Sequence, residues 1–425
     1  MLKKIIGTAG ARVFNAFLSF VIVIVYARNL GAEGAGIIAE IVLGITIVLL
    51  ISNFFGGGAL VYLLPRHDNF IIFLLSYIWA IISAFVVTYF LNLFNAVPAK
   101  FIYDVLLLSI IQSFSAVNQN ILLSKEKIKL YNSISVLQFS GLFAALMFFI
   151  FVLKKVEVSS YVNALYVGYS VGFVLSFVSI LKYLKFKGFN DLGNIIKQIL
   201  KYGSYVQFAN ILQFLNYRLS YYIITSYFNK AMLGVYSVGN KLSEGTWLVG
   251  KSVSMVQYSR IANSKDKEYN KYLTLAFLKF TFVITLILVA ILLLIPENVF
   301  VFVFHKEFSN IKIVISSLSV GIVAMSMSMM FSHYFSGTGR HYYNTISSGI
   351  GLIITFALGF TLIPRYNILG AGITASVSYF TICLFQLIVF VKLTKSRFND
   401  FLIKKTDVKL FFQEVGRILK KDDKN

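Results

Sequence analysis

Long apolar runs recur along the whole chain and are separated by short polar connections. Each is near the roughly 20 residues that an α-helix needs to cross the hydrocarbon core of a membrane. The run that begins at residue 36 is longer than one span, and we expect the glycines at 56, 57 and 58 to bend or end it. The predicted spans are 8–27, 36–60, 69–93, 101–123, 131–153, 161–184, 203–227, 232–256, 272–295, 310–334, 343–363 and 369–392. The pattern therefore predicts an all-α, polytopic membrane protein with twelve transmembrane helices.

Composition excludes an ordinary soluble protein. Of the 425 residues, 58% are hydrophobic and 13% are charged, and the mean hydropathy is +0.79. A soluble domain is about 45–50% apolar and about 25% charged. The apolar stretch after Lys3 and Lys4 is too long for a signal peptide and no small-residue cleavage site follows it, so we expect a first helix that acts as its own signal. Cys383 is the single cysteine, which excludes an intramolecular disulfide.

The net charge of +22 is unevenly distributed over the loops. One set of loops holds Lys125, Lys127, Lys129, Lys182, Lys185, Lys187, Lys197, Lys201, Arg260, Lys265, Lys267 and Arg340. The opposite set holds fewer cations, namely Arg28, Lys100, Lys154, Lys155, Lys230, Lys306, Lys312 and Arg365. Because cytoplasmic loops are enriched in Lys and Arg, the first set and both termini are predicted to be cytoplasmic. The excess charge therefore requires no nucleic-acid partner.

The two halves of the chain resemble each other weakly. Residues 29–37 and 229–236 each place a short turn and a glycine at the start of an apolar helix. Six spans per half are typical of transporters whose substrate site lies between two lobes. We expect lobes at 1–190 and 191–393 around a central cavity, and a cytoplasmic amphipathic tail at 394–425 on the anionic inner leaflet. A loosely ordered charged tail is the alternative.

Four cations lie inside the apolar runs, namely Arg12, Arg218, Lys241 and Lys251. At the centre of a membrane helix, such a residue costs about 2.5–3.5 kcal/mol on insertion scales, and it usually faces a wet cavity or a partner. Polar residues that hold helices together need no unbalanced charge. The four cations therefore indicate a cavity that binds an anion.

Other polar residues share helix faces with these cations. Asn240, Lys241, Glu244, Trp247 and Lys251 fall within an arc of about 120° on the eighth predicted span. Lys241 and Glu244 are spaced i, i+3 and are predicted to pair. Candidate sugar contacts are Asn15, Asn210, Tyr217 and Trp247, although residues of these types also hydrogen-bond helices together.

Glu40 lies near the start of the second span. This acid can pair with Arg12, bind a coupling cation (a proton or sodium), or sit at the interface. We expect no catalytic residues, no metal ligands and no cofactor, because nucleotide-binding, metalloprotease and serine-hydrolase motifs are absent from the sequence.

Three segments resemble one known family. They are ARNLGAEGAG at 27–36, LNYRLS at 215–220 and LIPRYNILGAGITA at 362–375. They resemble the opening from the first into the second span, the seventh span and the eleventh-to-twelfth span junction of the polysaccharide-export flippases of the multidrug/oligosaccharidyl-lipid/polysaccharide (MOP) superfamily. The resemblance implies an O-antigen or related repeat-unit flippase in a bacterial inner (plasma) membrane. Its substrate would be an undecaprenyl-pyrophosphate-linked oligosaccharide of lipopolysaccharide, capsule or exopolysaccharide assembly, and a glycan polymerase would be a partner.

Three alternatives stay open. A multidrug cation antiporter shares the twelve-helix plan, but it should present acids where this chain has Arg12 and Arg218. A lipid II flippase is closer, although such proteins usually have fourteen spans. A membrane glycan polymerase is the enzyme alternative, and it would be expected to carry a larger outer loop than residues 296–309.

Overall fold

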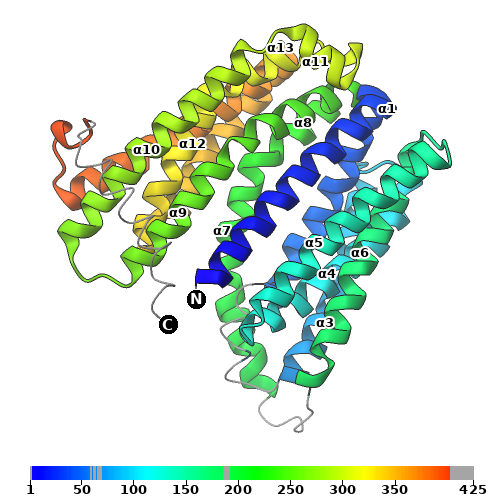
Figure 1. The fold of residues 1–425 in the computed structure, drawn as a ribbon, viewed down its shortest axis with the longest axis horizontal. Helices are drawn as coiled ribbons and strands as arrows, with labels where there is room; N and C mark the ends of the chain where they lie inside the picture. The colour runs from blue at the N-terminus through cyan, green and yellow to red at the C-terminus, as the bar shows by residue number, and fades with distance from the viewer. Residues whose placement is uncertain (1, 58–59, 61–63, 65–68, 185–191, 403–425) are drawn as a thin grey trace. The chain divides into compact units, whose positions relative to one another are not determined.

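The computed structural model describes residues 2–57, 60, 64, 69–184 and 192–402. Within these ranges the chain is helical and contains no strands. The α-helices are α1 (Leu2–Gly56), α3 (Asn69–Leu93), α4 (Ile102–Ser124), α5 (Ile128–Met147), α6 (Val158–Ile180), α7 (Leu192–Tyr227), α8 (Lys230–Gly245), α9 (Trp247–Ala262), α10 (Lys267–Leu294), α11 (Glu297–Phe304), α12 (Ile311–Gly337) and α13 (Tyr342–Thr394). The all-α prediction is confirmed (Figure 1).

Two of the longest helices each contain two predicted spans. In α1 the helix breaks at Gly31, whose backbone angles are φ 70° and ψ −174°. Residues with a side chain rarely adopt a positive φ, so glycine is suited to this position. In α13 the break is at Asn367, with φ 46° and ψ −127°, and Pro364 lies just before it. The expected end of the second span is also correct, because α1 ends at Gly56.

The eighth predicted span is not one helix. It is divided into α8 and α9, which meet at Thr246. The Thr246 backbone N–H donates to the Ser243 carbonyl at 3.2 Å, and the Thr246 hydroxyl donates to the same carbonyl at 2.8 Å. This local competition for a backbone acceptor, next to the poor helix former Gly245, ends α8.

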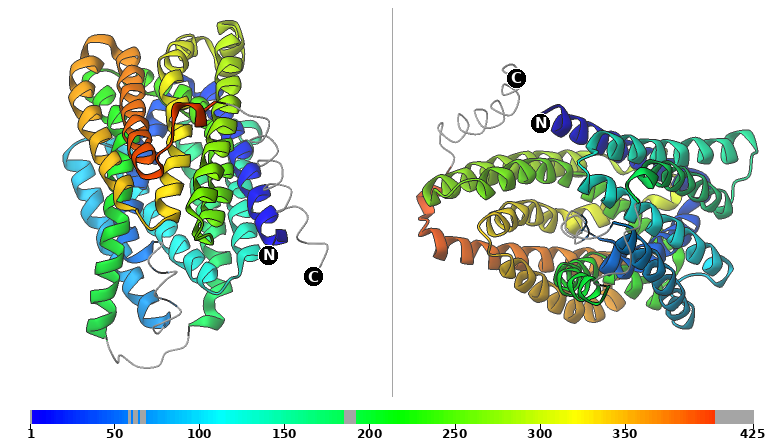
Figure 2. Two further views of the ribbon diagram at one scale, coloured as in Figure 1. Left: turned by 90° about the vertical axis from the view of Figure 1, so that its left-hand side faces the viewer. Right: turned by 90° about the horizontal axis from the view of Figure 1, so that it is seen from below.

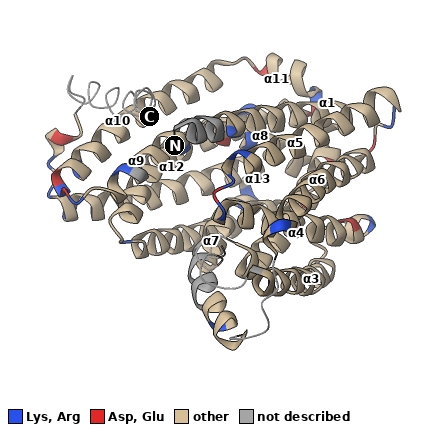
Figure 3. Cartoon of the chain, turned by 60° about the horizontal axis from the view of Figure 1, so that its bottom comes forward, with Lys and Arg blue, Asp and Glu red and all other residues tan. Residues whose placement is uncertain are grey.

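The helices have the length and composition of membrane spans. Within the part of the chain that the structure describes, eight helices are long and apolar enough to cross a membrane, and α1 and α13 are among them. Since α1 and α13 each hold two predicted spans, the chain is a multi-pass membrane protein. Long stretches of helix carry no charged residue, as the tan ribbon in Figure 3 shows.

The chain divides into two compact units. The first comprises Lys4–Ile211, and the second comprises Leu212–Asn425 with Met1–Lys3. The division falls inside α7, and the predicted lobe boundary after residue 190 stays a prediction.

In the first unit α6 packs against both α4 and α5, as Figure 1 shows. The last carbonyls of α1 in this unit accept side-chain hydrogen bonds. Ser76 donates to Phe55 at 2.6 Å and Asn120 donates to Gly56 at 2.7 Å. These bonds satisfy backbone oxygens that the helix itself leaves unpaired.

In the second unit α12 lies against α8, α9, α10 and α13. Figure 2 shows α12 and α13, in yellow and orange, side by side. Their close approach depends on small residues: the Ser376 hydroxyl donates to the Ser317 carbonyl at 2.6 Å, and a Cβ added at Gly372 would overlap the Ser317 side chain.

The segment after α13 contacts the start of α10. Asp400 Oδ2 lies 3.2 Å from the Nζ of Lys271, which is largely buried. The predicted amphipathic helix of the tail is not tested, because residues 403–425 lie outside the described residues.

Candidate functional site

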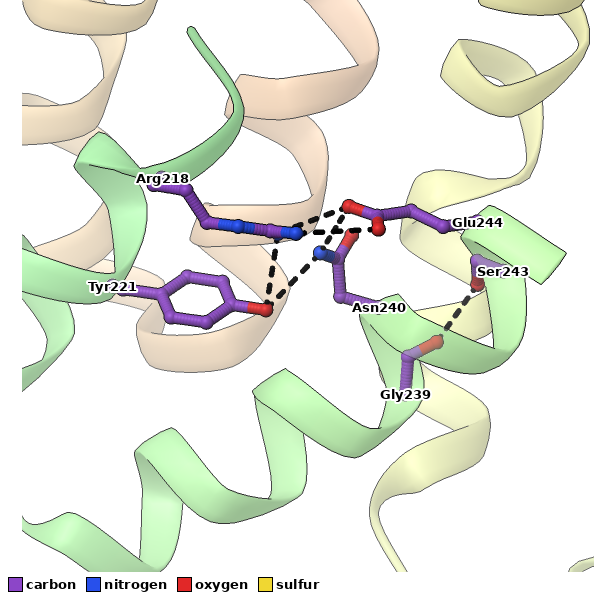
Figure 4. Close-up of polar contacts among 6 residues, drawn as sticks. All are labelled: Arg218, Tyr221, Gly239, Asn240, Ser243 and Glu244. Carbon is purple, nitrogen blue, oxygen red and sulfur yellow. Dashed lines mark hydrogen bonds and ion pairs between the residues drawn. The ribbon is translucent and has the colours of Figure 1, made fainter. Parts of the chain in front are cut away.

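A charged pair joins α7 to α8 in the second unit. Arg218 Nη1 lies 2.9 Å from Glu244 Oε1, and Nη2 lies 3.3 Å from Oε2 (Figure 4). Both nitrogens of the guanidinium fork therefore contact the carboxylate, which is the stronger, two-point form of this ion pair. The Arg218 and Glu244 side chains are 23% and 17% exposed, so the pair is mostly buried but still accessible from outside the protein.

Two neutral side chains complete this network. Asn240 Nδ2 donates to Glu244 Oε1 at 2.9 Å and lies 3.2 Å from the Tyr221 hydroxyl. Arg218 Nη1 also donates to that hydroxyl at 3.2 Å. Figure 4 shows Arg218 and Tyr221 approaching from α7 and the other two side chains from α8. The carboxylate is thus held by donors from both helices.

Local sequence fixes which face of α8 meets α7. Asn229 caps the start of α8, where its side chain accepts from the Met232 backbone N–H at 2.9 Å. At Gly239 an added Cβ would lie 2.8 Å from Cβ of Val314, so this glycine lets α8 lie close to α12. Asn240 and Glu244, four residues apart, then share the face that contacts Arg218.

The two predicted lysines lie beside this network and are both exposed. The charges of Lys241 and Lys251, like that of Arg218, act on Glu244. Lys251 Nζ lies 5.8 Å from the centre of the Trp247 ring. Among these four charged residues, three cations face one carboxylate, so the site has a positive excess.

The structure shows no ion pair between the described residues Lys241 and Glu244, which the sequence predicted, although the charge of Lys241 acts on the carboxylate. The carboxylate instead binds Arg218 across the helix–helix contact and Asn240 on its own helix. Spacing of i, i+3 permits a contact between two side chains but does not require it. Arg218 has the better geometry, because its planar fork matches both carboxylate oxygens.

Trp247 belongs to a buried aromatic cluster. Its ring centre lies 5.6 Å from that of Tyr217 and 5.8 Å from that of Tyr379, and its indole N–H donates to the Ile322 carbonyl at 3.3 Å. Trp247 is 2% exposed, so the expected contact between its ring and a sugar requires rearrangement. Tyr217 is half-buried and accepts from the exposed Gln213 at 3.0 Å. Gln213 is a polar neighbour of the site that was not predicted, although its i, i+4 spacing from Tyr217 is the signal.

The other predicted residues lie in the first unit. Arg12 is exposed on α1, and Glu40 is 3% exposed. Asn15 Nδ2 donates to the Ser135 hydroxyl at 2.8 Å, which joins α1 to α5. Asn210 is exposed and donates to Gln207 at 3.1 Å. The Asn15 contact joins two helices, and the sugar contacts expected of Asn15 and Asn210 stay predictions.

Comparison with known proteins identifies the fold. No family model matches the chain. Over 177 residues it is 26% identical to the capsular polysaccharide biosynthesis protein CapF of Staphylococcus aureus. The aligned region covers 41% of this chain and 44% of CapF. The chain thus spans less than half the length of the curated relative that it matches.

Solved structures match over almost the full length. The lipid II flippase MurJ, in an inward closed conformation, superposes with a TM-score of 0.73 at 15% identity, over 97% of this chain and 91% of MurJ. An inward-facing multidrug resistance transporter of the MATE family superposes with a TM-score of 0.68 at 16% identity, over 93% of this chain and 96% of that transporter. The chain has the fold of MOP-superfamily transporters. The twelve-helix prediction agrees with this fold.

Proposed function

We propose that this chain is a flippase that moves a lipid-linked oligosaccharide from the inner to the outer leaflet of a bacterial inner membrane. The substrate would carry its glycan on undecaprenyl pyrophosphate. The observation that carries the proposal is the positive excess of the site, where Arg218, Lys241 and Lys251 surround Glu244. Cations in a membrane protein are costly unless they bind a partner, and a pyrophosphate supplies matching negative charge.

The physical demands of the task fit the proposed arrangement. The polyprenyl tail of such a lipid can stay in the bilayer while the head group crosses. Only the charged and sugar-bearing part needs a polar route, which a cavity exposed to each side in turn would provide. Gln213 and Tyr217, on the same helix as Arg218, would supply hydrogen bonds to sugar, and a substrate contact for Arg12 stays a prediction.

The comparisons support a polysaccharide or cell-wall substrate. CapF is named for capsular polysaccharide biosynthesis, and MurJ is named as a lipid II flippase. A lipid II flippase is therefore the second candidate, since its likeness in fold covers 97% of this chain. The positive excess argues against the third, a multidrug cation antiporter, because like charges repel a cationic drug.

Several finer features belong to the same proposal. A coupling cation, either a proton or sodium, would use Glu40 or Glu244 as its acid. The translocated repeat unit would pass to a glycan polymerase for assembly into O-antigen, capsule or exopolysaccharide. Both termini would be cytoplasmic, as the distribution of Lys and Arg predicts.

Reconstituted transport distinguishes these functions. Purified protein in vesicles is supplied with a polyprenyl-diphosphate oligosaccharide, with lipid II, or with a cationic dye, and movement across the bilayer is measured. We expect the protein to accelerate the first substrate above protein-free vesicles and above lipid II. Acceleration of the dye alone would refute the flippase proposal. Preference for lipid II would select the second candidate.

A further inference from the structure

Glu244 occupies the place that an anionic substrate would take at Arg218. Its two oxygens contact the two terminal nitrogens of the guanidinium, at 2.9 and 3.3 Å. Phosphoryl oxygens bind arginine with the same two-point geometry. A diphosphate that binds Arg218 in this way must therefore displace the carboxylate.

The surroundings of Glu244 provide for such a displacement. Asn240, on the same helix, already donates to Oε1 at 2.9 Å, so the carboxylate keeps one donor when it leaves Arg218. The exposed Lys241 and Lys251 add attractive charge beside it. The pair itself is reachable, since the Arg218 and Glu244 side chains are 23% and 17% exposed.

The helix geometry confines the exchange to side chains. Gly239 holds α8 close to Val314 of α12, and the Ser243 hydroxyl donates to the Gly239 carbonyl at 3.0 Å on the part of α8 shown in Figure 4. The Asn240 amide also lies 3.2 Å from the Tyr221 hydroxyl of α7. These contacts hold α8 against its neighbours, so the exchange would need a rotation of the Glu244 side chain and no shift of the helix.

We infer that Glu244 is a displaceable internal counter-ion of Arg218, which gives the guanidinium up to the diphosphate of the substrate and takes it back when the substrate leaves. This inference rests on the proposed function. In the empty site the carboxylate neutralises an arginine that would otherwise be partly buried without a counter-charge. In the loaded site its competition weakens binding, and a transport site must bind weakly enough to release its cargo.

The sequence offers an internal reporter for a binding test. It contains two tryptophans, Trp79 and Trp247, and Trp247 lies beside Lys251 and Tyr217. In a Trp79→Phe background, Trp247 fluorescence of the purified full-length protein is titrated with farnesyl diphosphate as the probe. The same titration with farnesol, which lacks the diphosphate, is the control.

Glu244→Gln removes the charge that competes for Arg218 but keeps an oxygen for Asn240. We predict that it binds farnesyl diphosphate about tenfold more tightly than its parent and translocates the lipid-linked oligosaccharide more slowly. If Glu244 had a purely structural role, the substitution would lower both the affinity for farnesyl diphosphate and the translocation rate. Arg218→Gln should lose most of the affinity, and Glu244→Asp, which keeps the charge, should bind within about threefold of the parent.

The outcomes separate the inference from the proposed function. Equal or weaker binding by Glu244→Gln, with a parent that binds and transports, overturns the counter-ion inference and leaves the flippase proposal standing. A parent protein that neither binds farnesyl diphosphate nor moves a lipid-linked oligosaccharide overturns both. If Glu244→Gln fails to fold, Glu244→Asp decides, because loss of its affinity together with normal folding contradicts the inference.

Discussion

Arg218 of α7 and Glu244 of α8 form a two-point ion pair, with Nη1 2.9 Å from Oε1. The pair connects two helices that are neighbours in the chain, and it leaves Lys241 and Lys251 as the exposed cations of the site. The two kinds of cation should therefore respond differently to substitution. Loss of Arg218 should affect both stability and transport, whereas loss of the lysines should affect transport alone.

Removing one member of the ion pair should destabilise the protein more than removing both. Arg218→Ala leaves Glu244 shielded without its main partner, and the cost of such a loss is about 3 kcal/mol. The double variant Arg218→Ala with Glu244→Ala should recover part of it. A double-mutant cycle of unfolding free energies in detergent should give a coupling energy of at least about 1 kcal/mol. A coupling energy of zero would show that the pair does not act as a unit.

Two glycines of α13 should respond in opposite ways to alanine. A Cβ at Gly372 would overlap the Ser317 side chain of α12, so Gly372→Ala should cost about 1–3 kcal/mol. Gly349 has nothing within 4 Å of an added Cβ, so Gly349→Ala should be neutral or stabilising by about 0.5–1 kcal/mol.

The single cysteine provides the measurement for this pair. Cys383 lies buried in α13 and becomes reactive to a thiol dye when the protein unfolds. When thermal unfolding is followed by that reaction, the transition temperature of Gly372→Ala should lie below that of the parent. The transition temperature of Gly349→Ala should equal or exceed that of the parent. Equal transitions for the two variants would contradict the close packing of α12 on α13.

Cysteine labelling should reveal the predicted orientation. In a Cys383→Ser background, new cysteines at 158, 230 and 305 should react with an impermeant maleimide added outside the cell membrane. A cysteine at Lys265 should react after the membrane is opened, because the cation-rich loops are predicted to be cytoplasmic. Labelling of residue 265, or of the segment 182–201 that includes the start of α7, from outside would contradict this topology.

Much of the fold follows from the sequence, because a membrane span is a local property. Twenty apolar residues must form a helix in lipid, where the backbone has no other hydrogen-bond partners. The glycine cluster in the sequence predicts the end of α1, but the hydropathy pattern does not predict the helix break at Thr246. It arises from a threonine hydroxyl that takes a backbone acceptor, and a hydropathy pattern does not record such a bond.

The sequence predicts the cations of the candidate site but not their partners, because those partners depend on tertiary packing. Cations in apolar runs are conspicuous, so Arg218, Lys241 and Lys251 could be selected from the sequence alone. The partner of Glu244 depends on which helix faces α8, and this is a tertiary contact. Trp247 is likewise on a helix of mixed polarity, and its burial against Tyr217 and Tyr379 follows from packing rather than from spacing.

The rate of lipid-linked oligosaccharide translocation in Lys241→Ala with Lys251→Ala tests the anion-binding role most directly. Neither lysine is packed in the interior, so folding should change by less than about 0.5 kcal/mol. The exposed Lys306 lies in the segment between α11 and α12, and Lys306→Ala is the matched control. We predict that the double variant loses at least about tenfold in rate and loses salt sensitivity, because salt screens exposed charges. The control should transport like the parent. A folded double variant that transports at the parental rate would contradict the anion-binding site.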